Sequence, residues 1–216
     1  NELPYLLKEN TEVLKRHFPK WKYYFFNSQQ SLKFIEQNFK EWADIYNNLP
    51  LSLKSELFRL LIIYQYGGFY VNIMFRCNLP WKNLTRHECV FPYKMELSDN
   101  NFSHFHLQPY DPLLQTQLGS YCFGAEKNAK FMKDALTIFK KRYEILVKNN
   151  KNNLTENNYL LACSVLSDTY YKGQVKYSKD YYHKNDKTYH KIHLLPGKLK
   201  PFKYAKKNTE NHWIFK

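Results

Sequence analysis

The 216-residue chain carries 33 Lys and Arg against 19 Asp and Glu, a formal net charge of +14. Apolar residues make up 44% of it and aromatic residues 18%, which excludes a disordered tail and favours one domain over residues 1–216 with a sizeable core. No run of about 18 apolar residues occurs, so we expect no membrane-spanning segment. The charge favours anionic partners such as nucleic acid, acidic lipid, anionic polysaccharide or an acidic protein face. The alternative is compositional drift in an AT-rich genome.

The four cysteines have no CxxC spacing and no histidine at zinc-finger distance. We therefore expect reduced or buried thiols in a cytoplasmic setting, with a disulfide pair as the alternative. For a viral chain, which the Asn, Lys and Tyr bias would suit, the matching location is the viral factory or the virion. The chain begins at Asn1 without a methionine, which leaves an upstream signal or anchor open. The cysteines are Cys77, Cys89, Cys122 and Cys163.

The first half of the chain alternates helical and strand patterns. Residues 3–17 have the spacing of an amphipathic helix, and the aromatic run 21–26 is typical of a strand. Helical spacing returns over residues 31–47 and, after Leu49 and Pro50, over residues 54–66. A β-prone run then follows at residues 69–73. This order of helix, strand, helix, helix, strand predicts an α/β domain.

The junction between the last helix and its strand is a glycine pair. Gly67 and Gly68 can supply the positive φ that ends a helix, so the sequence predicts helix, elbow and strand in direct succession. On the helix, Glu56 and Arg59 lie one turn apart. On the strand, residues 72 and 74 are predicted to share one side.

The second half gives weaker patterns. Residues 82–120 read as irregular strands and loops, in which His104 and His106 are more typical of ordinary histidines than of metal ligands. Residues 131–146 predict a long amphipathic helix, and residues 155–158 a further helix start.

A basic, tyrosine-rich run covers residues 172–191. Interleaved cations and aromatic rings can bind nucleic acid through phosphate contacts and base stacking. The alternative is a solvated pair of strands with buried tyrosine rings and outward lysines. The candidate basic surface consists of Lys172, Lys176, Lys179, Lys184, Lys187 and Lys191.

One family resembles the chain at its best-defined stretch. Ser55, Glu56 and Arg59, followed by Tyr-Gly-Gly-Phe-Tyr at residues 66–70 and a strand, resemble the sugar-binding region of DXD-motif glycosyltransferases, in particular the capsular-polysaccharide and initiation-specific mannosyltransferase-like enzymes. The resemblance implies a GT-A-like, Rossmann-like α/β fold with a mixed sheet flanked by helices. The family's first strand, of the Ile-Pro-Lys-Ile-Ile-His type, has no counterpart here, because the chain begins just after its place.

The resemblance also predicts a binding pocket for a nucleotide or sugar. Its candidate residues are Glu56, Arg59, Gly67, Gly68, Tyr70, Asn72, Met74 and Trp213. A purely structural explanation serves several of them: the glycines make the elbow, Tyr70 packs, and Arg59 pairs with Glu56 or a neighbouring acid.

The metal ligands of the family are replaced. Its strand ends in Asp-x-Asp, where this chain has Asn72 and Met74, and its C-terminal histidine pair corresponds to Lys207 and Asn208. Mn²⁺ and Mg²⁺ prefer anionic oxygen ligands, whereas an amide oxygen is neutral and a thioether is soft. We therefore assign no catalytic residue, no metal ligand and no cofactor, with Mn²⁺ or Mg²⁺ required only if this interpretation is wrong.

Three functional hypotheses follow. The first is a pseudo-glycosyltransferase that serves as a binding or structural module with a basic surface. The second is an active transferase in which cations such as Arg59 and Lys207 replace the metal at the departing diphosphate. The third is a nucleic-acid-associated protein, whose binding would weaken steeply with salt.

Overall fold

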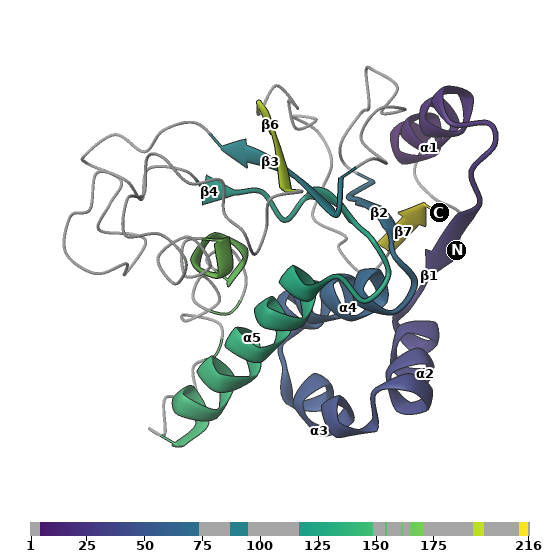
Figure 1. The fold of residues 1–216 in the computed structure, drawn as a ribbon. Helices are drawn as coiled ribbons and strands as arrows, with labels where there is room; N and C mark the ends of the chain where they lie inside the picture. Colours follow the sequence, from purple (N-terminus) through teal and green to yellow (C-terminus); the bar gives the residue numbers. More distant parts are fainter. Residues whose placement is uncertain are drawn as a thin grey trace, which may run out of the picture.

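The computed structural model describes residues 5–73, 87–94, 117–148, 154, 161, 165–170, 192–196 and 212–215. Its helices and strands form the mixed α/β arrangement that the sequence predicts (Figure 1). The helices are α1 (Tyr5–His17), α2 (Ser28–Asn38), α3 (Lys40–Asn48), α4 (Leu51–Tyr66) and α5 (Lys130–Lys148). The strands are β1 (Tyr23–Phe26), β2 (Gly68–Val71), β3 (Cys89–Lys94), β4 (Gln117–Leu118), β5 (Cys122–Ala125), β6 (Ile192–Pro196) and β7 (His212–Phe215).

All seven strands join one sheet in the order β1-β7-β2-β5-β3-β4, with β6 also paired to β3. The β3–β6 pair is parallel and the other pairs are antiparallel, so the sheet is mixed, as predicted. The C-terminal strand β7 lies between β1 and β2 (Figure 1). Strands from the two ends of the chain are therefore neighbours in the sheet.

The sheet carries helices on both faces. Successive side chains of a strand point to opposite faces, and β2 follows this rule. Phe69 and Val71 pack with Leu14 of α1, whereas Tyr70 packs with the cluster that contains α2, α3, α4 and α5. Among the described residues, α1 packs on one face, whereas α2 to α5 and the helical residues 165–170 pack on the other.

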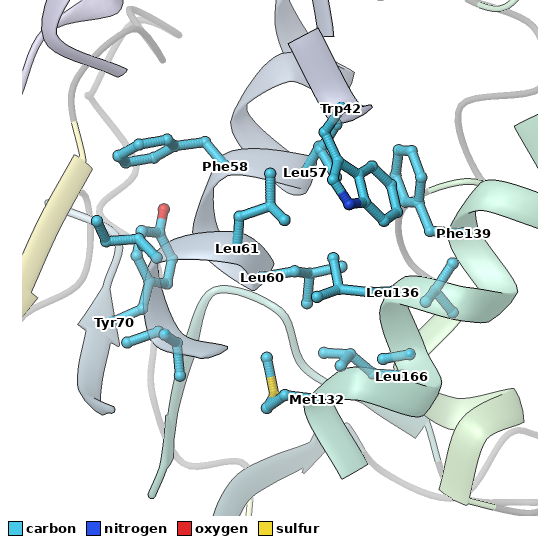
Figure 2. Packing of buried hydrophobic residues seen from close by; sticks show 14 of the residues in the cluster. Trp42, Leu57, Phe58, Leu60, Leu61, Tyr70, Met132, Leu136, Phe139 and Leu166 are labelled. Atoms are coloured by element: carbon cyan, nitrogen blue, oxygen red, sulfur yellow. The ribbon is translucent and has the colours of Figure 1, made fainter. Parts of the chain in front are cut away.

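The larger core lies between α4, α5 and the sheet. Leu57, Phe58 and Leu61 of α4 are each 0% exposed. Figure 2 shows Tyr70 of β2 near Phe58, and Met132 of α5 below the α4 leucines. This core therefore packs directly against β2 through Tyr70.

The predicted single helix at residues 31–47 is wrong. The structure has two helices, because the backbone at Phe39 leaves helical geometry (φ −145°, ψ 56°) while its N–H still bonds the carbonyl of Ile35 at 2.7 Å. The Phe39 ring is 7% exposed and contacts Phe34 and Tyr64. Burial of this ring therefore accompanies a change of direction that hydrophobic spacing does not report.

Three further predicted helices are confirmed with shifted ends, whereas the helix start predicted at residues 155–158 lies outside the described residues. Residues 3–17, 54–66 and 131–146 correspond to α1, α4 and α5. Helix α2 begins at Ser28, because Asn27 and Gln30 form a reciprocal capping box. Among the helices that the structure describes, none is long and apolar enough to cross a membrane.

Two cysteines are placed, and both are buried and form no disulfide among the described residues. Cys89 is 0% exposed and Cys122 is 3% exposed, on opposite faces of the sheet. Burial raises the pKa of the Cys89 thiol well above its ordinary value, which keeps it protonated and unreactive. Cys77 and Cys163 lie outside the described residues, as do His104, His106 and the run 172–191.

Candidate functional site

The glycine elbow between α4 and β2 is the first part of the site. Gly67 has φ +68° and ψ −168°, and its N–H bonds the carbonyl of Ile63 at 2.8 Å. A Cβ on Gly67 would lie 2.6 Å from the backbone nitrogen of Lys127. Gly68 also has a positive φ, of 97°. The predicted elbow is confirmed, and at Gly67 both backbone angle and space require glycine.

Arg59, on α4, is held by groups of the protein's own fold. Its Nε donates to the carbonyl of Ser55 at 3.3 Å, and its Nη1 donates to the carbonyl of Ser120 at 2.6 Å. Its Nη2 lies 3.0 Å from Oε1 of Glu56. The guanidinium carbon lies 4.7 Å from the ring centre of Tyr70. All three nitrogens of the guanidinium therefore already have partners, and Arg59 is only 6% exposed.

Burial shifts the pKa values of two ionisable neighbours of Arg59, Glu56 and Tyr70. Burial raises the pKa of the Glu56 carboxyl, against the opposing effects of the Arg59 charge and a hydrogen bond with Ser120. Burial also raises the pKa of Tyr70 to about 12, with the nearby Arg59 charge acting in the opposite direction. We name Glu56, Arg59, Tyr70 and Ser120 the arginine cluster. Its members stabilise one another within the fold.

Strand β2 ends at Val71, and Asn72 is the next residue. The strand therefore does not extend to Ile73, and the expectation that residues 72 and 74 share one side of it is not met for Asn72. The N–H of Asn72 donates to the carbonyl of Tyr121 at 2.8 Å. Tyr121 directly follows Ser120, so the backbone that Arg59 holds is also the backbone that holds Asn72.

A hydrogen bond from α1 also holds the segment that follows β2. The side-chain nitrogen of Asn10 donates to the carbonyl of Ile73 at 3.0 Å, and Asn10 is 1% exposed. Asn10 is not among the site residues predicted from the sequence. Its signal was available, since Asn10 lies three residues after Leu7 and four before Leu14 on the apolar face of the helix. A buried amide on such a face needs a polar partner, and here it finds one 63 residues away.

The remaining pocket candidates are placed in part. Trp213 lies in β7 opposite Val71 of β2 on one side and Phe25 of β1 on the other, so the sheet brings the C-terminal segment beside the site. Met74, Lys207 and Asn208 lie outside the described residues, and so does the candidate basic surface. Whether the candidate residues form a pocket for a nucleotide or sugar stays a prediction.

A divalent metal does not fit the residues at this place. Asn72 offers a neutral amide oxygen and Met74 a thioether, where a hard cation prefers carboxylates. Over the described ranges, no three His, Cys, Asp or Glu side chains gather into a group that could hold a metal ion. No step of a metal-dependent transfer can be derived from these donors.

The comparison with protein families gives one match. Residues 4–91 match the family described as the glycosyltransferase sugar-binding region containing the DXD motif. Over these residues the chain is glycosyltransferase-like. The match covers α1 to β2 and reaches into β3, and so includes the elbow and the Asn72 position. Neither the search of curated proteins nor the search of solved structures found a match.

The match supports the coarser part of the sequence prediction, a glycosyltransferase-like chain with a mixed α/β fold. The subfamily and the extension of the resemblance beyond residue 91 stay predictions.

Proposed function

We propose that this protein is a glycosyltransferase-like protein that has lost metal-dependent transfer and serves as a binding or structural module. The donors at Asn72 and Met74 support the loss, because neither supplies the anionic oxygen that would tie a cation to a diphosphate. Next to Asn72, the described part of the chain has the glycine elbow and the hydrogen bonds from Asn72 to Tyr121 and from Asn10 to Ile73.

The observation that carries this proposal is the arginine cluster. A donor sugar or diphosphate that contacted Arg59 would have to displace the Ser120 carbonyl, the Glu56 carboxylate or the Tyr70 ring. Removing a buried ion-pair partner without an equally good replacement is costly. The cluster is thus better explained as a structural tie between α4, β2 and the start of β5 than as an open binding site.

The net charge of +14 supports an anionic partner for such a module. Nucleic acid, acidic protein and anionic polysaccharide remain the candidate classes, together with a residual nucleotide or nucleotide-sugar at the site itself.

Transfer without a metal is the alternative. It needs a cation that faces the diphosphate, and Arg59 is instead directed to Ser55, Ser120 and Glu56. Hydrolysis of labelled nucleotide-sugars in the presence of EDTA would favour this alternative. Inertness across a panel of donors would count against it.

The experiment that tests the proposal is a titration of nucleotides and nucleotide-sugars with and without Mn²⁺. We expect no binding that depends on the metal. Binding that appears only with Mn²⁺ would overturn the proposed loss of the metal site.

A further inference from the structure

One groove of the structure is lined by residues that do not belong to the arginine cluster. It has a volume of about 380 Å³ and runs between α3, α4 and α5. Trp42 and Tyr64 contribute aromatic surface to it, and its α5 wall carries Lys133, Lys140 and Lys141. A volume of this size falls in the range of small-ligand sites, roughly 300–1,000 Å³.

The cations of this wall are available to a ligand. Lys133 and Lys141 are exposed, and among the described residues neither forms an ion pair. By contrast, Lys130 on the same helix bonds Asp134 at 2.7 Å. The Nζ of Lys140 lies 5.9 Å from the ring centre of Trp42, so this lysine contacts the aromatic part of the groove.

The spacing of the two exposed lysines constrains the length of the ligand. Eight residues separate Lys133 from Lys141, which is about 12 Å along a helix axis at ~1.5 Å per residue. A single hexose is too short to place an anion at both ends. This spacing favours an extended chain with separated negative charges, which can contact both lysines at once.

Two carboxylates in the groove further restrict the chemistry of the ligand. Glu41 of α3 and Glu144 of α5 also line the groove, and both are exposed. A nucleic-acid strand bears a charge on every phosphate and would meet these carboxylates with repulsion. A sugar chain that alternates acidic and neutral residues can instead offer hydroxyl groups to the carboxylates and aliphatic ring faces to the aromatic surface.

We infer that the groove between α3, α4 and α5 binds an acidic oligosaccharide in which charged and neutral sugars alternate. The inference rests on the proposed function, because it names the anionic partner of the binding module. Lys133 and Lys141 pair with the acidic groups, and Glu41 and Glu144 accept from the hydroxyl groups of the sugars between them.

The test is a calorimetric titration of the full chain with a tetrasaccharide of alternating glucuronate and N-acetylglucosamine. We expect binding that the double variant K133Q/K141Q weakens about fivefold to tenfold, as expected for two exposed charge contacts. The matched control K8Q/K33Q removes two exposed helical lysines outside the groove and should change the affinity less than about twofold. Backbone amide shifts should change along α5 and at the start of α3.

Several results would overturn the inference. One is no binding of the tetrasaccharide, and another is equal weakening by the two double variants. Stronger binding of a thymidine oligonucleotide or of a hexaglutamate peptide would assign the groove to a different class of partner. Equal binding of a neutral chitin tetrasaccharide would remove the role of the lysines.

The proposed function and this inference can fail separately. Metal-dependent binding of nucleotide-sugars contradicts only the proposed function, and K133Q/K141Q should leave any such binding unchanged. Failure of the oligosaccharide to bind contradicts only the assignment of the groove.

Discussion

At the scale of single residues, Arg59 connects more parts of the molecule than any other candidate residue described above. It bonds Ser55 and Glu56 on its own helix, the Ser120 carbonyl before β5, and the face of the Tyr70 ring on β2. The sequence predicts the pairing with Glu56 from their spacing. It could not predict Ser120, because that contact joins residues 61 positions apart.

We expect Arg59→Met to lower the free energy of unfolding by about 3 kcal/mol, because it leaves the largely buried Glu56 carboxyl without its cation. Arg59→Lys should recover only part of this loss, since one ammonium cannot reach all the partners of the guanidinium. Chemical denaturation measures both. The matched control is Lys130→Met, which breaks an exposed pair with Asp134 and should cost no more than about 0.5 kcal/mol. Similar losses for Arg59→Met and Lys130→Met would contradict the structural role of the arginine cluster.

The raised pKa of Tyr70 makes the stability of the protein depend on pH in the alkaline range. Its pKa is raised to about 12 by burial, so the unfolded chain loses this proton near pH 10 while the folded protein still holds it. The resulting stability is present below pH 10 and is lost as the pH rises toward 12. Tyr70→Phe should therefore reduce the fall in unfolding free energy between pH 9 and pH 12 by about 2 kcal/mol.

Denaturant unfolding at several alkaline pH values measures this effect. Tyr24→Phe, at an exposed position of β1, is the control and should leave the fall unchanged. Identical pH profiles for wild type and Tyr70→Phe would show that the Tyr70 hydroxyl is not buried as described.

At the scale of elements, the helix-elbow-strand unit was predictable and the strand's surroundings were not. Gly67 and Gly68 announce the elbow because only glycine readily adopts positive φ there. The break at Phe39 and the end of β2 at Val71 carry no such signal, since hydrophobic spacing continues across both positions. The position of β7 between β1 and β2 depends on long-range pairing, which local patterns do not encode.

Gly67→Ala tests the elbow. The added Cβ would have to tolerate φ +68° and a 2.6 Å approach to the Lys127 nitrogen, so we expect a loss of about 3 kcal/mol in unfolding free energy. Gly119→Ala is the matched control: its φ is not positive, and the three atoms nearest to its Cβ belong to the side chain of Tyr121 and not to the backbone. We expect about 1 kcal/mol for the control, and equal losses in thermal or chemical unfolding would argue against the strained elbow.

At the scale of the whole molecule, the predicted fold class is present, whereas Asn72 and Met74 do not support the family's metal chemistry. The chain keeps a mixed sheet with helices on both faces, and residues 4–91 keep the pattern of a glycosyltransferase sugar-binding region. Apolar periodicity and glycine placement are enough to predict this fold class. The sequence has Asn72 and Met74 where the resemblance leads us to expect acidic ligands, so the proposed loss of the metal site rests on the sequence. The hydrogen bonds that hold the segment after β2, from Asn10 to the Ile73 carbonyl and from the Asn72 N–H to the Tyr121 carbonyl, required the structure.

The central claim is that the Asn72 position no longer binds a sugar donor through a metal. Calorimetric titration of UDP, GDP and their sugar conjugates into the full chain, with and without Mn²⁺, tests it most directly. We expect Mn²⁺ to add no binding to any of these ligands. Micromolar binding that requires Mn²⁺ and disappears in EDTA would contradict it and would restore an ordinary metal-dependent glycosyltransferase.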